Sequence, residues 1–208
     1  MTGPRPMRSM WPAPAGRGST SRAWGGNLQE DYPFVANDYI ADMIVASPQL
    51  DAWDEQSASD VVGLTEWLLG AYSIDADHVY LSGCSGGGET ISIVLGTRPE
   101  LYRRALHTIS RWDGDIETLT AAEVPVYMAI GENDDYYGSR PAREAYEEIR
   151  AAYRARRLSE ERISELVVLD VKPTSYFTER GFAADAGQHG AGGYLFARDE
   201  DIMGWLFS

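Results

Sequence analysis

The chain has 208 residues, 44% of them hydrophobic, and a formal net charge of −14, which together are typical of one globular domain with a substantial core. The negative charge argues against nucleic acid and anionic membrane surfaces as partners, and no apolar run reaches the roughly 20 residues of a membrane-spanning helix. A single cysteine excludes an intramolecular disulfide and a cysteine-cluster metal site.

The N-terminal segment differs from the rest of the chain. Residues 1–29 are rich in Pro, Gly, Ser and Arg and contain no acidic residue. They show neither helical nor alternating periodicity, so we expect residues 1–35 to be irregular or flexible and residues 36–208 to form the domain. The segment lacks the apolar core of roughly 7–15 residues that a signal peptide requires, which favours a cytoplasmic protein. A transit peptide is the weaker alternative.

From Asp42 onward, short apolar runs alternate with helical patterns. Because continuous apolar runs are typical of strands buried on both faces, the pattern predicts an α/β fold with a mostly parallel sheet and helices on both faces. We expect strands at residues 42–48, 78–82, 105–110, 125–131 and 166–171. We expect helices at residues 57–72, 87–95, 99–104, 141–156 and 200–207, with a glycine-rich loop before the last one.

The strand at residues 78–82 ends in the run Gly83-Cys84-Ser85-Gly86-Gly87. A phosphate-binding loop would need a lysine where the chain has Glu89, and the dinucleotide-binding pattern is broken by the serine at position 85. The run instead matches G-x-S-x-G, in which small neighbours allow a serine to occupy a strained turn between strand and helix. In that geometry the N–H of Gly86 faces a tetrahedral oxyanion. A glycine-rich turn without chemistry is the alternative.

Cys84 is a second candidate nucleophile, because it too has small flanking residues. The distance from the end of the strand to the turn favours Ser85. Cys84 is then a small buried side chain beside the serine.

A serine nucleophile requires a general base, and the chain contains three histidines. His78 opens the strand before the turn and lies at the opposite end of the sheet. His107 lies inside a strand, where a buried histidine usually has a structural role. His189 lies in the glycine-rich loop at the carboxyl edge of the sheet and is therefore the predicted base.

The predicted acid follows the strand at residues 125–131. Asp134 comes three residues after the strand and Asp135 is next, although an ordinary acidic turn would look the same. The order Ser85, Asp134, His189 is the chain order of an α/β-hydrolase triad.

With these motifs the chain resembles the α/β-hydrolase superfamily, and within it bacterial serine esterases of the polyhydroxybutyrate-depolymerase-like and prolyl-oligopeptidase-like type. The resemblance is carried by "VYLSGCSGGGET", "PVYMAIGENDDYYGS" and "GQHGAGGYLFARDEDIMGWLF" and covers the chain from Asp42 onward. It implies that Ser85 is the nucleophile, His189 the general base and then acid, and Asp134 the orienting carboxylate. Asp135 is the fallback acid.

The resemblance implies hydrolysis of a small-molecule or polymeric carboxylic ester through an acyl-enzyme, with no metal or organic cofactor. Possible walls of the substrate pocket are Cys84, Trp112, Tyr136 and Tyr137. Two alternatives remain at this point: a catalytically impaired or non-catalytic module of the same fold, and a peptidase of the prolyl-oligopeptidase type.

One part of the family pattern is missing from residues 1–41. In the family, a strand that precedes residues 42–48 lies in space between them and residues 78–82, and its loop donates the second oxyanion N–H. No stretch of residues 1–41 has the pattern of that strand, so the first strands of the core are expected to be absent, and only Trp24-Gly25-Gly26-Asn27 resembles the loop. A gap would leave two rows of unpaired backbone groups, and one lost oxyanion donor costs about 10²–10³ in rate.

Overall fold

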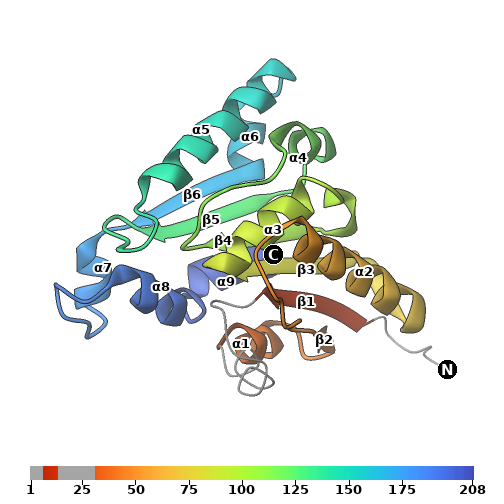
Figure 1. Ribbon diagram of the computed structural model, residues 1–208, viewed down its shortest axis with the longest axis horizontal. Coiled ribbons are helices and arrows are strands. Elements are labelled where there is room, and N and C mark those ends of the chain that lie inside the picture. The colour runs from red at the N-terminus through yellow and green to blue at the C-terminus, as the bar shows by residue number, and fades with distance from the viewer. Residues whose placement is uncertain (1–6, 14–30) are drawn as a thin grey trace.

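The computed structural model describes residues 7–13 and 31–208 of the chain (Figure 1). Within these residues, six strands form one parallel sheet in the order β2-β1-β3-β4-β5-β6. The strands are β1 (Met7–Ala13), β2 (Met43–Val45), β3 (Ile74–Cys84), β4 (Arg104–Thr108), β5 (Val126–Gly131) and β6 (Val167–Lys172). The predicted parallel α/β sheet is therefore confirmed.

Helices cover both faces of this sheet. The apolar side chains of α2 to α6 pack in one core, and those of α1 and α7 to α9 pack in a second core on the opposite face. The helices are α1 (Asp31–Tyr39), α2 (Glu55–Ala71), α3 (Gly86–Leu95), α4 (Ile116–Ala122), α5 (Arg140–Ala155), α6 (Glu160–Leu166), α7 (Thr174–Thr178), α8 (Gln188–Phe196) and α9 (Glu200–Phe207), with a 3₁₀ turn at Pro99–Leu101.

The two cores follow from the alternation of side chains along each strand. On β3, Val79 and Leu81 belong to the core under α2 to α6, whereas Tyr80 and Cys84 belong to the core on the other face. Because successive side chains of a strand point to opposite faces, a run that is apolar at every position supplies both cores. This is why the central strands could be recognised as continuous apolar runs.

Strand β1 corrects the expectation for the N-terminal segment. Residues 7–13, predicted to be irregular, pair with β2 on one side and with β3 on the other, and α1 begins at Asp31. Met10, for example, is in register with both Val45 and Tyr80. The expected gap inside the sheet is therefore wrong, because β1 precedes both neighbours in the chain and lies between them in space.

A second difference concerns the predicted glycine-rich loop, which contains helix α8. A Cβ atom at Gly192 would lie 2.8 Å from the side chain of Ile109, so the absence of a side chain lets α8 approach the end of β4. The glycines that argued for a loop therefore serve close packing of a helix. The helices α1, α4, α6 and α7 were not predicted.

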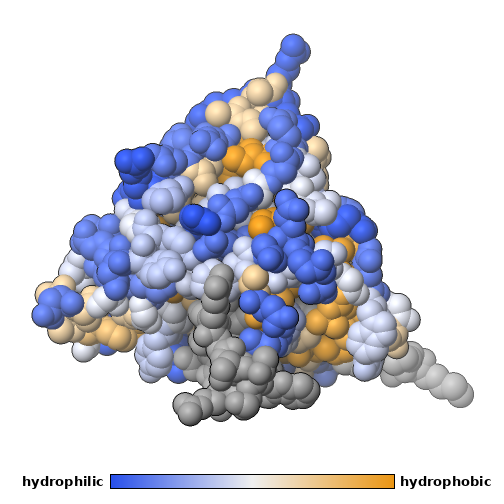
Figure 2. Space-filling model, in the orientation of Figure 1, coloured by the Kyte–Doolittle hydropathy of each residue, from blue (hydrophilic) through white to orange (hydrophobic). Residues whose placement is uncertain are grey.

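Both hydrophilic and hydrophobic residues lie on the surface of the molecule. Figure 2 shows the hydrophobic residues of one face as separate patches among hydrophilic ones. In the part of the chain that the structure describes, no helix is both long enough and apolar enough to cross a membrane.

Candidate active site

Ser85 occupies a strained turn between β3 and α3, with φ 55° and ψ −125°. Positive φ is uncommon for a residue other than glycine. Two residues earlier, a Cβ at Gly83 would lie 2.3 Å from the carbonyl oxygen of Gly87, so the turn excludes a side chain there. The end of β4 holds the serine backbone: Ser85 N donates to the carbonyl oxygen of Thr108 at 3.1 Å, and Ser110 Oγ donates to that of Ser85 at 2.6 Å.

The side chains of Ser85, His189 and Asp134 form one hydrogen-bonded series. Ser85 Oγ lies 2.8 Å from His189 Nε2, and His189 Nδ1 lies 2.9 Å from Asp134 Oδ2. The three come from separate elements, because Ser85 follows β3, Asp134 follows β5 and His189 is in the first turn of α8. All three elements meet at the carboxyl edge of the sheet, as parallel strands require.

The carboxylate of Asp134 is buried but well hydrogen-bonded. Its Oδ1 accepts the backbone N–H groups of Tyr136 and Tyr137, at 3.0 and 2.7 Å. Burial alone would raise the pKa of Asp134, but the hydrogen bonds from His189 and from these two N–H groups outweigh it, so the pKa is lowered. Asp134 is therefore ionised at neutral pH.

Asp135, the fallback acid, holds the same histidine by its backbone. Its Oδ1 accepts the N–H of His189 at 2.9 Å. The neighbouring Gln188 is buried and its Oε1 accepts the N–H of Asn133 at 2.8 Å. The first turn of α8 is thus tied at two points to the loop after β5, which fixes where the imidazole lies.

The other two histidines lie outside this series. His78 Nδ1 is 2.7 Å from Asp75 Oδ2 near the amino end of β3. His107 is buried in β4 and its Nε2 donates to the carbonyl oxygen of Arg111 at 3.0 Å. Burial lowers the pKa of His107 to about 4, so this imidazole is neutral at pH 7.

A cavity of about 530 Å³ is lined by two tyrosines that neighbour the histidine, although neither Ser85 nor His189 lines it. Tyr136 and Tyr137, which were predicted as pocket walls, line it, and their rings lie 5.1 and 5.6 Å from the His189 ring. Trp53, Glu89 and Arg111 also line it, and sequence reasoning missed all three. One signal for Glu89 was available, because it follows Ser85 by about one helical turn.

The other two predicted wall residues lie elsewhere. Trp112 packs with its ring 5.4 Å from that of His107, and its indole N–H donates to the carbonyl oxygen of Gly114 at 2.9 Å. Cys84 is buried in the core between the sheet and α8. Neither residue lines the cavity beside His189.

Gly86 is the first residue of α3, so its N–H belongs to the first-turn donors that lack a partner within the helix. This N–H directly follows Ser85 in the chain. The segment Trp24-Gly25-Gly26-Asn27 lies outside the described residues.

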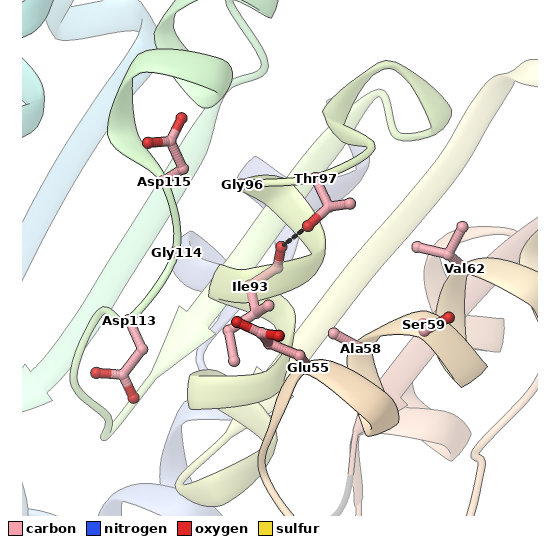
Figure 3. A pocket seen from close by; sticks show the side chains of 10 residues that line it. All are labelled: Glu55, Ala58, Ser59, Val62, Ile93, Gly96, Thr97, Asp113, Gly114 and Asp115. Atoms are coloured by element: carbon pink, nitrogen blue, oxygen red, sulfur yellow. Dashed lines mark hydrogen bonds between the residues drawn. The ribbon is translucent and has the colours of Figure 1, made fainter.

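A second cavity, of about 570 Å³, opens elsewhere on α3 (Figure 3). Figure 3 shows it between α2 and the loop of residues 113–115, with Ile93 of α3 and Thr97, which follows that helix, between them. It shares no lining residue with the cavity beside His189. Within residues 7–13 and 31–208, no group of three or more His, Cys, Asp or Glu side chains is arranged to hold a metal ion.

Comparison with known protein families shows to which family the chain belongs. The family described as Peptidase S9, the prolyl oligopeptidase family, matches residues 49–168, which is more than half of the sequence. The chain belongs to the prolyl oligopeptidase family. The region matched to the prolyl oligopeptidase family includes Ser85 and Asp134, and His189 lies beyond it. No curated protein matches the chain in sequence.

Solved structures place this prolyl oligopeptidase family member among α/β-hydrolase folds. A thermostable esterase has a TM-score of 0.74 at 16% identity over 98% of this chain and 54% of its own, so the chain spans about half of that esterase. The serine hydrolase FphF of Staphylococcus aureus has a TM-score of 0.64 at 12% identity, covering 100% of this chain and 86% of its own. Est1E of Butyrivibrio proteoclasticus, solved with ferulic acid bound, has a TM-score of 0.60 at 9% identity, covering 98% and 89%.

The family and the fold agree. The chain belongs to the prolyl oligopeptidase family and has the α/β-hydrolase fold that solved esterases and serine hydrolases share.

Proposed function

We propose that the chain hydrolyses carboxylic esters through an acyl-enzyme, with Ser85 as nucleophile, His189 as general base and acid, and Asp134 as the orienting carboxylate. The observation that carries this proposal is the series Ser85 Oγ to His189 Nε2 at 2.8 Å and His189 Nδ1 to Asp134 Oδ2 at 2.9 Å. Both distances are within hydrogen-bond reach, as proton transfer from a serine hydroxyl requires.

The reaction proceeds in two halves. Ser85 Oγ attacks the acyl carbon while His189 Nε2 takes the hydroxyl proton, and the bond to the alcohol oxygen breaks as His189 returns that proton to the alcohol. Water then attacks the acyl-serine by the same steps and releases the acid. Asp134 stays ionised and stabilises the imidazolium through Nδ1–H. The N–H of Gly86 donates to the tetrahedral oxyanion.

Structural neighbours named as esterases favour an ester substrate over a peptide. Membership of the prolyl oligopeptidase family favours the second candidate, a peptidase that uses the same three side chains. The two candidates differ in the leaving group, which is an alcohol for the esterase and an amine for the peptidase.

A fluorophosphonate probe tests the nucleophile. We expect the wild type and Ser164→Ala, a control serine exposed on α6, to be labelled, and Ser85→Ala not to be labelled. A folded wild-type protein that is not labelled would overturn the proposal and favour a non-catalytic module.

Matched p-nitrophenyl esters and peptide p-nitroanilides test the substrate class. We expect kcat/KM to be larger for the esters. Faster cleavage of the anilides would show that the peptidase is the correct assignment.

A further inference from the structure

Glu89 is a buried carboxylate that ester hydrolysis does not use. It lies in the first turn of α3, with 6% of its surface exposed, and it lines the cavity beside His189. Its Oε1 accepts a short hydrogen bond from the Tyr137 hydroxyl, and its Oε2 lies 3.1 Å from Arg111 Nη2. Arg111 is half exposed, so only the carboxylate of this pair is buried. Burying a carboxylate is unfavourable for folding unless it is paired and hydrogen-bonded, so the place of Glu89 at the site calls for a functional reason.

The hydroxyl of Tyr137 connects this carboxylate to the reacting serine. Burial and Glu89 raise the pKa of Tyr137, and its hydroxyl also interacts with Ser85. The phenol therefore stays protonated at neutral pH and donates its proton to Glu89. Its oxygen lone pairs are then available to accept a hydrogen bond from a ligand.

The cavity also has three aromatic walls: Trp53, Tyr136 and Tyr137. The Trp53 ring lies directly against Gly86, where an added Cβ would be 2.0 Å from it. Tyr136 is 64% exposed, so its ring is accessible to a ligand in the cavity that it lines. The rings of Tyr136 and Tyr137 are 4.6 Å apart and meet edge to face.

Each charged side chain that lines the cavity already has a partner. Arg111 pairs with Glu89 and with Asp113, each at 3.1 Å. Asp54 is the N-cap of α2, where its carboxylate accepts the N–H of Ser57 at 3.0 Å and lies at the positive end of the helix dipole. An ionic ligand would therefore have to compete with an existing partner of the charge that it binds. An uncharged ligand that offers both hydrogen-bond donors and acceptors would not.

From these observations we infer that the cavity receives a neutral, polyhydroxylated ring, so that the substrate is an ester of a sugar hydroxyl. The inference rests on the proposed ester hydrolysis and names its leaving alcohol. The ring hydroxyls donate to Glu89 and to the Tyr137 oxygen and accept from Arg111, while the apolar C–H face of the ring packs on the aromatic walls. The volume of about 530 Å³ suits a small-molecule site.

The bond changes balance without a further reactant. The acyl–oxygen bond of the ester breaks, the acyl group is transferred to Ser85, and His189 delivers the serine proton to the released sugar hydroxyl. Water then hydrolyses the acyl-serine and regenerates the serine hydroxyl.

Three acetates with the same six-membered skeleton test the inference. They are methyl 6-O-acetyl-glucopyranoside, cyclohexylmethyl acetate, and the cationic (1-methylpiperidin-4-yl)methyl acetate. We expect kcat/KM for the sugar acetate to exceed that for the cyclohexyl acetate at least about tenfold, because a hydrogen bond to a charged group is worth that much or more. A cyclohexyl acetate hydrolysed as well as the sugar acetate would overturn the inference, and so would preference for the cationic acetate.

Two variants probe the named walls. We expect Glu89→Gln and Tyr137→Phe each to reduce the sugar-to-cyclohexyl ratio of kcat/KM about tenfold, because each removes a hydrogen bond that only the sugar can make. Glu66→Gln, which alters an acid–arginine pair with Arg98 on the surface, should leave the ratio unchanged. Tyr137→Phe removes only a hydroxyl group, so this variant keeps the test valid if Glu89→Gln does not fold. An unchanged ratio in Tyr137→Phe would overturn the inference.

The two proposals fail in different ways. A wild-type protein that is neither labelled by the fluorophosphonate nor able to hydrolyse p-nitrophenyl acetate would overturn the proposed function. Normal hydrolysis of p-nitrophenyl acetate without preference for the sugar acetate would overturn only the inference of a sugar ester. Ligand-observed NMR of methyl glucopyranoside with Ser85→Ala reports the site without turnover. We expect saturation transfer from the Ser85→Ala protein to the glucoside, and we expect the double variant with Tyr136→Ala to lose it. Absence of transfer from the Ser85→Ala protein would contradict the inference.

Discussion

The carboxylate of Asp135 accepts the backbone N–H of His189 at 2.9 Å, while the side chain of the preceding residue, Asp134, contacts the imidazole of the same histidine. Two adjacent aspartates therefore hold one histidine at two different points. Asp134 acts on the charge and tautomer of the ring, and Asp135 acts on the position of the helix that carries it.

These two roles predict that the same substitution lowers kcat strongly at position 134 and only slightly at position 135. Asp134→Asn should lower kcat by about 10⁴, because an amide that donates to Nδ1 stabilises the wrong tautomer. Asp135→Asn should retain most of kcat, because an amide oxygen still accepts the backbone N–H of His189. Asp135→Ala should lower kcat about tenfold, the equivalent of one lost hydrogen bond. The measurement is the steady-state hydrolysis of p-nitrophenyl acetate, and equal losses in both asparagine variants would contradict these two roles.

The histidines give a second contrast. His189→Ala should abolish turnover, because it removes the proposed general base beside Ser85. His107→Ala should instead destabilise the fold by roughly 2 kcal/mol, because it empties a buried site and removes one hydrogen bond to the carbonyl oxygen of Arg111. Urea unfolding and ester hydrolysis measured on both variants separate the effects. Turnover lost in His107→Ala and kept in His189→Ala would show that the base is assigned to the wrong histidine.

His107 also predicts how stability depends on pH. Its pKa is about 4 in the folded protein, against an ordinary value of 6.5, so the unfolded chain binds more protons between these values. Stability therefore falls as the pH decreases from about 6.5 towards 4, by about 2 kcal/mol at pH 5 from this group alone. Urea unfolding at pH 7 and pH 5 measures the loss. The variant His107→Gln should lose less stability over the same interval, and an equal loss would show that other groups cause it.

Gly83 predicts a steric effect on the turn that holds Ser85. Gly83→Ala should destabilise the fold by about 1–3 kcal/mol, because its Cβ would meet the rigid backbone oxygen of Gly87. Gly63→Ala is the matched control, since this exposed position inside α2 has no atom within 4 Å of the added Cβ. The control should stabilise the protein by about 0.5–1 kcal/mol through helix propensity. Thermal unfolding of both variants tests the pair, and equal shifts in Tm would contradict it.

The catalytic candidates could be predicted because each carries a local signature. Ser85 lies in a five-residue motif that only a strained turn requires, and Asp134 and His189 follow it in the expected order. The helical context of His189 could not be predicted, since glycines in α8 lower helix propensity and are explained only by contact with Ile109. Trp53 and Arg111 reach the cavity from distant parts of the chain, without a local pattern.

Strand β1 was missed for a related reason. Its sequence MRSMWPA contains Arg8, Ser9 and Pro12, and a proline argues against a strand in the middle of a sheet. The pairing partners on both sides, rather than any local pattern, define this strand. Such a strand is visible only once the tertiary structure is known.

The position of β1 has a consequence for how the chain folds. Strands β3 to β6 follow one another in space as they do along the chain, so they can associate in sequence. Strand β1 instead pairs with β3 across the part of the chain that contains α1, β2 and α2, as the pairing of Met10 with Tyr80 shows. Such distant pairings are closed late and slow folding. Until β1 docks, β3 has an open hydrogen-bonding edge and β2 has no strand to join. This partly assembled sheet is therefore the species most prone to aggregate by edge-to-edge pairing during refolding.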